Sequence, residues 1–197
     1  MGLLEGTGIE LLDRFASPDP TPGGGSAAAL AGALGAGLVS MVSAMPKTRT
    51  GAPGERDRLD AALGWAREAG ARLRRLVDDD AAAYDAVVAA YRLAKGTDEE
   101  KAFRKAAVAS AMERATEVPF RTAEACLVVL KAAQEAAAHG NANALSDART
   151  AGALAWAGLV GAAENVRINS GPEAADLEGL EAILREGRDR AASLRVL

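Results

Sequence analysis

The sequence contains very few of the side chains that bind metals or form disulfides. Of its 197 residues one is cysteine and one is histidine, and only 4% are aromatic. A single cysteine, Cys126, cannot form a disulfide within the chain and fits a reducing compartment. A histidine-based metal site is excluded, because His139 stands alone. These shortages leave backbone groups, amides and carboxylates for any chemistry.

Strong charge of either sign is also lacking. The formal net charge is −4, and lysines and arginines are spread along the chain without a basic stripe among aromatic residues. The sequence therefore does not favour nucleic-acid binding. Glu5, Glu10 and Asp13 stand where a signal peptide would have a basic and then an apolar run. We expect a cytoplasmic protein.

One uncharged stretch has the length of a membrane span. The twenty residues 26–45 carry no charge, but most of them are alanine, glycine or serine. A helix facing lipid would be richer in large apolar residues, so a central helix surrounded by other helices is the better interpretation, and we expect no membrane partner. Gly32, Gly35 and Gly37 would let neighbouring helices approach its backbone.

Helical spacing recurs along the whole chain, whereas no segment alternates with the period of a strand. The sequence predicts one all-α domain over residues 1–197, a bundle of long helices around the Ala/Gly-rich helix. Alanine buries little area per residue, so such a core needs many long helices or a second subunit, and we expect a homodimer.

The expected elements are a short helix with Ile9, Leu12 and Phe15, the uncharged helix ending at Pro46, a long helix from Pro53 to Tyr91, a capping box at Thr97–Glu100, helices kinked or separated by Pro119 and ending at His139, a helix over 144–165, and a last helix opened by Ser170–Glu173.

The sharpest local motif is the glycine turn, residues 20–26, which directly precedes the uncharged helix. Gly23, Gly24 and Gly25 leave backbone N–H groups unobstructed, and a helix N-terminus adds partial positive charge. Such a turn can hold an anion or let a ligand approach the main chain. The alternative is a flexible turn in which Ser26 serves as the N-cap.

Three further segments carry polar groups suited to chemistry. A turn at 140–147 offers Asn141, Asn143 and Asp147, although these residue types are also common in loops and caps. Glu124 shares its window with apolar residues, and burial there would raise its pKa and suit it to proton transfer. Alternatively, it faces solvent and pairs with Arg121 or Lys131. Three aspartates at 78–80 point in different directions on a helix, so they do not form one metal site and more often mark a solvated face.

In this order and spacing, these segments resemble the cyclodeaminase domain of formiminotransferase-cyclodeaminases and the stand-alone bacterial proteins similar to it. The resemblance covers most of the chain. It is carried by the segments 22–26, 76–81, 92–93, 97–101, 118–119, 123–124, 140–141, 146–147 and 165–169.

The resemblance implies an all-helical dimer with a folate pocket and no metal or organic cofactor. Cyclodeaminases close N10 of 5-formiminotetrahydrofolate onto the formimino carbon and release ammonia, which leaves 5,10-methenyltetrahydrofolate. The family name favours this reaction. Relatives instead hydrolyse the methenyl bridge, as methenyltetrahydrofolate cyclohydrolases, and a formiminotransferase is a possible partner.

The chemistry of these reactions suggests roles for the site residues that the resemblance implies. Glu124 and Asp147 are the candidates for proton transfer, with Asp80 in reserve. The pterin would be positioned by Gly23, Gly24, Gly25 and Ser26 together with Asn141 and Asn143. Lys47 or Arg49 would bind the carboxylate of the folate tail. We expect the glycine turn, Glu124 and the 140–147 turn to converge around one cavity.

One departure from the family pattern stands after the uncharged helix. Relatives often have a tyrosine or phenylalanine there, but this chain reads Met-Pro-Lys-Thr-Arg-Thr over residues 45–50. The missing aromatic motivates a second hypothesis, a helical folate-binding protein without turnover.

Overall fold

The computed structural model describes residues 2–170 and 177–197, and within them every regular element is a helix. The all-α prediction is confirmed. The expected box at Ser170–Glu173 lies outside the described residues except for its first residue. The elements are η1 Leu3–Glu5, α1 Gly8–Ala16, α2 Gly24–Ala44, α3 Glu55–Tyr91, α4 Asp98–His139, η2 Ala142–Ala144, α5 Leu145–Ser170 and α6 Leu177–Ser193.

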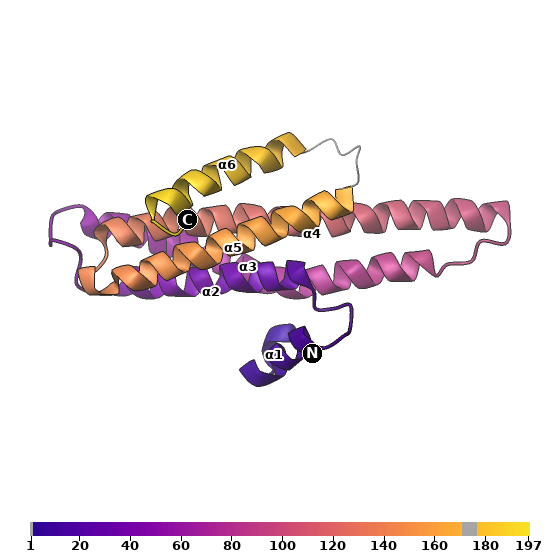
Figure 1. Ribbon diagram of the computed structural model, residues 1–197, viewed down its shortest axis with the longest axis horizontal. Coiled ribbons are helices and arrows are strands. Elements are labelled where there is room, and N and C mark those ends of the chain that lie inside the picture. Colours follow the sequence, from indigo (N-terminus) through magenta and orange to yellow (C-terminus); the bar gives the residue numbers. More distant parts are fainter. Residues whose placement is uncertain (1, 171–176) are drawn as a thin grey trace.

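The helices α2, α3, α4 and α5 form an elongated antiparallel bundle (Figure 1). The C-terminal end of α3 and the N-terminal part of α4 continue beyond the other helices as a protruding hairpin (Figure 1). On one side α6 packs against α4 and α5, and on the other side α1 stands away from the bundle. The start of α2, the middle of α3 and the end of α5 therefore meet near the centre of the molecule.

The capping box predicted at the start of α4 is present. Thr97 Oγ1 accepts a hydrogen bond from the Glu100 backbone N–H at 3.2 Å, and Glu100 Oε2 accepts one from the Thr97 backbone N–H at 3.1 Å. These bonds satisfy donors that the first turn of a helix otherwise leaves unpaired. The local sequence thus determined where α4 begins.

Pro119 does not separate two helices, so that part of the prediction is wrong. Helix α4 runs through Pro119 without interruption. Proline has no backbone N–H, so the carbonyl of Ala115, four residues earlier, loses its usual helical partner. Asn169 of α5 replaces that partner, because its Nδ2 donates to the Ala115 carbonyl at 2.7 Å. A contact from another helix therefore makes the proline tolerable here.

Glycines let α2 pack closely against its neighbours. A Cβ built on Gly32 would lie 2.6 Å from Cys126 Sγ, and one on Gly35 would lie 2.8 Å from the Ala151 carbonyl oxygen. The expected role of Gly37 is wrong, since a Cβ there would meet nothing within 4 Å. Cys126 is fully buried at this crossing, and burial raises the pKa of its thiol to about 12.

Helix α2 is long and apolar enough to cross a membrane by length and composition alone. In the structure it contacts α3, α4 and α5, which accounts for its apolar character. It is not enclosed on all sides, however, because Leu34 and Met41 are 55% and 44% exposed. Part of its apolar surface is left without a partner.

Candidate functional site

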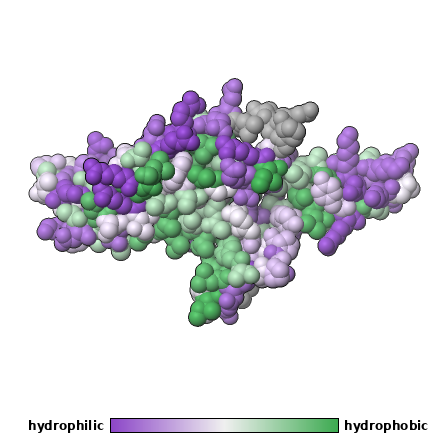
Figure 2. All heavy atoms as spheres, viewed as in Figure 1, coloured by the Kyte–Doolittle hydropathy of each residue, from purple (hydrophilic) through white to green (hydrophobic). Residues whose placement is uncertain are grey.

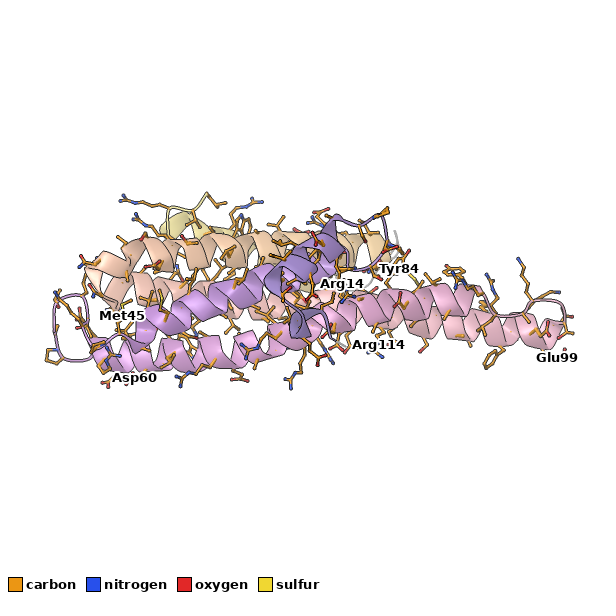
Figure 3. All side chains as sticks on the ribbon, turned by 90° about the horizontal axis from the view of Figure 1, so that it is seen from below. Arg14, Met45, Asp60, Tyr84, Glu99 and Arg114 are labelled. Atoms are coloured by element: carbon orange, nitrogen blue, oxygen red, sulfur yellow. The ribbon has the colours of Figure 1, made fainter. Side chains whose placement is uncertain are left out.

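A cavity of about 310 Å³ lies where the glycine turn meets α3, α4 and α5. Figure 3 labels Tyr84 and Arg114 in this central region, with Glu99 at the tip of the hairpin and Met45 at the opposite end. The cavity wall combines main chain from the turn with polar and apolar side chains. Its lining residues are Pro20, Thr21, Gly23, Gly24, Gly25, Asp80, Ala83, Tyr84, Val87, Met112, Ala115, Asn165, Ile168 and Asn169.

Asp80 reaches from α3 to the N-terminus of α2. Ser26 Oγ lies 3.0 Å from Asp80 Oδ2 and 2.9 Å from the Val77 carbonyl oxygen. A Cβ on Gly25 would lie only 2.1 Å from Asp80 Oδ1, so the carboxyl group occupies the space that a side chain would need. Glycine at position 25 is therefore required for Asp80 to take this position.

Burial in the cavity wall raises the pKa of Asp80, and hydrogen bonds from the Ser26 side chain and backbone only partly oppose that effect. The Ser26 hydroxyl has one hydrogen, which it can give to Val77 or to Asp80. When it is given to Val77, a protonated Asp80 donates to Ser26 in return. Asp80 should therefore exchange its proton at a higher pH than an ordinary carboxyl group does.

The three consecutive aspartates have three different surroundings. Asp78 Oδ1 accepts a hydrogen bond from the Leu3 backbone N–H at 2.6 Å, which ties η1 to α3. Asp79 faces Arg114 at 3.9 Å, and Asp80 lines the cavity. The helix therefore spreads these carboxylates as expected. Asp79, whose side chain is 48% exposed, fits the predicted solvated face, whereas Asp78 and Asp80 are engaged with other parts of the protein.

Two asparagines of α5 give the cavity hydrogen-bond acceptors. Asn165 Nδ2 donates to the Gly161 carbonyl at 2.8 Å, and Asn169 Nδ2 donates to the Ala115 carbonyl at 2.7 Å. Since their amino groups are engaged on the main chain, their amide oxygens are the atoms left to a ligand. Together with the Asp80 carboxyl group they suit a ligand whose edge carries N–H donors.

Glu124 lies outside this cavity. Its Oε2 accepts a hydrogen bond from Nη2 of Arg72 at 3.0 Å, and its side chain is 44% exposed. Along α4 it is about 13 Å from Ala115, which lines the cavity. The alternative of a solvent-facing ion pair is confirmed, but the expected partner is wrong: the cation is Arg72, not Arg121 or Lys131.

The remaining predicted residues lie at the other end of the bundle. Asp147 and Asn165 are on the same helix, about 27 Å apart at 1.5 Å per residue. Asn141 caps η2 by accepting a hydrogen bond from the Asn143 backbone N–H at 3.0 Å. Lys47 is exposed, and Arg49 bonds through its backbone N–H to the His139 carbonyl at 2.8 Å. The expected convergence of the three segments is not found within one chain.

Sequence reasoning missed Asn165, Asn169 and Tyr84 as cavity residues. The first two fall in a segment that resembles the family, so a signal existed, but no local pattern connects them with the glycine turn. They meet it because α2 and α5 run antiparallel, which places Gly24 beside Asn165. Among the described residues, no group of three His, Cys, Asp or Glu side chains is placed to hold a metal ion.

Comparisons with known proteins agree on one family. A model of the formiminotransferase-cyclodeaminase family matches residues 8–185. A methenyltetrahydrofolate cyclohydrolase from Methylorubrum extorquens is 44% identical over 163 residues, which cover 81% of this chain and 76% of that protein. The formimidoyltransferase-cyclodeaminase of Rattus norvegicus is 40% identical over 152 residues, which cover 75% of this chain but only 27% of the rat protein.

A solved structure gives the same result for the fold. The crystal structure of formiminotetrahydrofolate cyclodeaminase from Thermotoga maritima superimposes with a TM-score of 0.74 and 25% sequence identity. The alignment covers 97% of this chain and 91% of the other, so nearly all of the helical architecture is shared.

Proposed function

Since this chain belongs to the formiminotransferase-cyclodeaminase family, we propose that it acts on the one-carbon bridge of a tetrahydrofolate derivative in the glycine-turn cavity. The observation that carries this site is the placement of Asp80, a half-buried carboxyl group held by Ser26 and facing 310 Å³ of open space. The matched region covers only 27% of the rat relative, so a formiminotransferase would be a separate protein, and such a protein stays a possible partner.

The acceptor groups of the cavity fit a reduced pterin. Its amino group and ring N–H groups are donors, and the amide oxygens of Asn165 and Asn169 are acceptors. Tyr84 and Ile168, both exposed at the rim, offer apolar surface to the rings. The open main chain at Gly23 and Gly24 lets a flat ligand approach the N-terminus of α2.

Asp80 is the proposed proton-transfer group. In hydrolysis, water attacks the cationic methenyl carbon and a base takes one proton of that water. The hydroxyl group formed on the bridge carbon then loses its remaining proton as the formyl C=O forms, while N5 is protonated as its bond to that carbon breaks. In deamination, a base takes the N10 proton as N10 attacks the formimino carbon, and ammonia leaves after protonation. A carboxyl group whose pKa is raised by burial suits both transfers.

Hydrolysis of the methenyl bridge is the reaction that the relatives support best. The cyclohydrolase aligns over most of its own length at the higher identity. Ammonia release, the reaction that the family name favours, is the second candidate, supported by the shared architecture of the Thermotoga maritima enzyme. A purely binding protein is the third.

Two assays on the purified chain separate these functions. In the first, 5,10-methenyltetrahydrofolate is added and the loss of its absorbance is compared with spontaneous hydrolysis. In the second, 5-formiminotetrahydrofolate is added, and gain of methenyl absorbance and release of ammonia are followed. We expect faster hydrolysis in the first assay, and tight binding without acceleration in either would favour the binding protein.

Asp80→Asn should lower turnover by about 100-fold or more while the helical content stays unchanged. Asp79→Asn is the matched control, because that neighbour pairs with Arg114 outside the cavity. Glu124→Gln and Asp147→Asn test the carboxylates chosen from sequence. If Asp80→Asn keeps near-normal rates while either of these loses activity, the catalytic site is not the glycine-turn cavity of a single chain.

We also propose that the protein is a cytoplasmic homodimer. A reduced, fully buried Cys126 supports the compartment. Apolar surface supports the dimer: Ile9 and Leu12 on α1 are 73% and 69% exposed, and Leu34 on α2 is 55% exposed. Figure 2 shows hydrophobic residues gathered on α1 and over the adjoining part of the bundle. A second copy would cover both surfaces.

A further inference from the structure

A second pocket, of about 500 Å³, lies at the end of the bundle remote from the glycine turn. It is formed by the loop after α2, the end of α4, the start of α5 and the end of α6. None of its lining residues is acidic, and three are arginines, although the chain as a whole has a net charge of −4. The lining residues are Arg49, Gln134, Ala137, Ala138, Leu145, Arg149, Ser193, Leu194 and Arg195.

The other polar groups of the pocket are already engaged with one another. Gln134 accepts a hydrogen bond from Arg190 and donates one to Ser193 Oγ, and Ser193 Oγ donates to the Arg190 carbonyl at 2.7 Å. Within the described part of the chain, no carboxylate lies within 4.0 Å of the guanidinium groups of Arg49, Arg149 or Arg195. The arginines are therefore the groups available to a ligand.

Two hydrogen bonds fix Arg49 at the pocket wall. Its Nη2 donates to the Ala137 carbonyl and its backbone N–H to the His139 carbonyl, while its Nε is buried and makes no hydrogen bond to the described residues. A buried donor without a partner is unfavourable, so holding Arg49 in this position has an energetic cost.

Arg195 adopts a backbone conformation that arginine rarely takes. Its φ is +58°, at the position after α6 where the N–H groups of Arg195 and Val196 bond back to Ala192 and Ala191 at 2.9 and 3.1 Å. Glycine is the usual residue at this position, because a Cβ is disfavoured there. Compensation of the helix dipole does not explain the choice, since Arg190 already stands in the last turn. Arg195 therefore takes this conformation at the expense of backbone strain.

We infer that Arg49, Arg149 and Arg195 form a binding site for a polyvalent anion bearing phosphate or carboxylate groups. Guanidinium groups bind such anions through paired, charge-assisted hydrogen bonds, and three of them around one pocket favour a ligand with more than one anionic group. The site stands about 30 Å from the glycine turn, at the other end of α2, and does not depend on the proposed reaction.

The test is calorimetric titration of the full chain with inorganic pyrophosphate and with citrate at fixed ionic strength. We expect saturable binding of a single anion per chain, weakened about tenfold or more by Arg149→Gln and by Arg195→Gly. Arg188→Gln removes the same single positive charge from an exposed position of α6 outside the pocket, so this variant should bind the anion like the wild type. Tighter binding of pyrophosphate indicates a phosphate ligand, and tighter binding of citrate a polycarboxylate.

Arg195→Gly also separates function from folding. Without anion it should unfold at the same temperature as the wild type or a higher one, because glycine suits a positive φ. The inference is overturned if neither anion binds saturably, or if Arg149→Gln and Arg195→Gly bind as tightly as Arg188→Gln.

Discussion

Pro119, in the middle of α4, influences the candidate site because it has no N–H to donate to the Ala115 carbonyl. The freed Ala115 carbonyl takes the amino group of Asn169, and this fixes the orientation in which Asn169 presents its amide oxygen to the cavity. Asp80 is positioned in a comparable way, by the missing side chain at Gly25 and by the Ser26 hydroxyl. At the scale of residues, the missing N–H of Pro119 positions Asn169, and the missing side chain of Gly25 makes room for Asp80.

Asn169→Ala should destabilise the fold by about 1–3 kcal/mol, because it leaves the buried Ala115 carbonyl without a partner. The same change in a Pro119→Ala background should cost less, since an alanine N–H restores the helical bond. Urea unfolding of the two single variants and the double variant measures this coupling. Asn165→Ala is the control: the Gly161 carbonyl that it bonds keeps its helical partner, so its cost should be the same in both backgrounds.

The loop between α2 and α3 is held in place by hydrogen bonds to one carboxylate, that of Glu55. Glu55 begins α3 and accepts hydrogen bonds from the Thr50 backbone N–H, the Thr50 hydroxyl and the Gly51 backbone N–H at 3.0–3.1 Å. A side-chain hydrogen bond from Thr48 is the largest cause that lowers its pKa, from 4.5 to about 2, and these bonds outweigh the opposing effect of burial. The ionised form of Glu55 therefore holds the loop.

The contribution of Glu55 to stability should be present above its ordinary pKa of 4.5 and should decline as the pH falls towards about 2. The difference in unfolding temperature between the wild type and Glu55→Gln should accordingly be largest near neutral pH and shrink in acid. Thermal unfolding followed by circular dichroism measures it. Glu68→Gln on the exposed face of α3 is the control, and a difference that is constant with pH would contradict the assignment.

At the scale of the whole molecule, the single chain leaves apolar surface uncovered. Helix α1 has no buried residue, although its apolar side chains lie on one face. Helix α2 adds Leu34 and Met41 to the exposed apolar surface. Burying these side chains against a second copy would stabilise the assembly by about 1.5–3 kcal/mol for each large residue.

The wild type should be a dimer at micromolar concentration, and Leu34→Glu or Met41→Glu should weaken dimerisation by about tenfold or more, because a charge would be buried without a partner. Light scattering after size-exclusion chromatography gives the mass. Phe103→Glu is the matched control, since Phe103 is 67% exposed at the protruding hairpin, away from α1 and α2. A monomeric wild type, or dimers unaffected by either charge, would contradict the proposed surface.

Much of the fold was predictable from local pattern, because helix periodicity and capping involve residues within one or two turns of each other. The hydroxyl of Thr97 and the carboxylate of Glu100 are sufficient to begin α4, and the uncharged run before Pro46 is sufficient to predict α2. The glycine turn was singled out as a possible ligand site for the same local reason, and it lines the cavity. The sequence by itself therefore determined the all-helical class, most helix ends and one wall of the cavity.

The other walls depended on which helix ends meet in space. Asp147 and Asn165 both belong to α5, but only Asn165 lies beside the glycine turn, because α5 runs antiparallel to α2. Pro119 was tolerated within α4 only because Asn169 bonds the freed carbonyl from another helix. Such contacts join residues far apart in the chain and leave no periodic signal. Tertiary packing therefore decided which carboxylate lines the cavity, and it placed Asp80 there while Glu124 and Asp147 lie elsewhere.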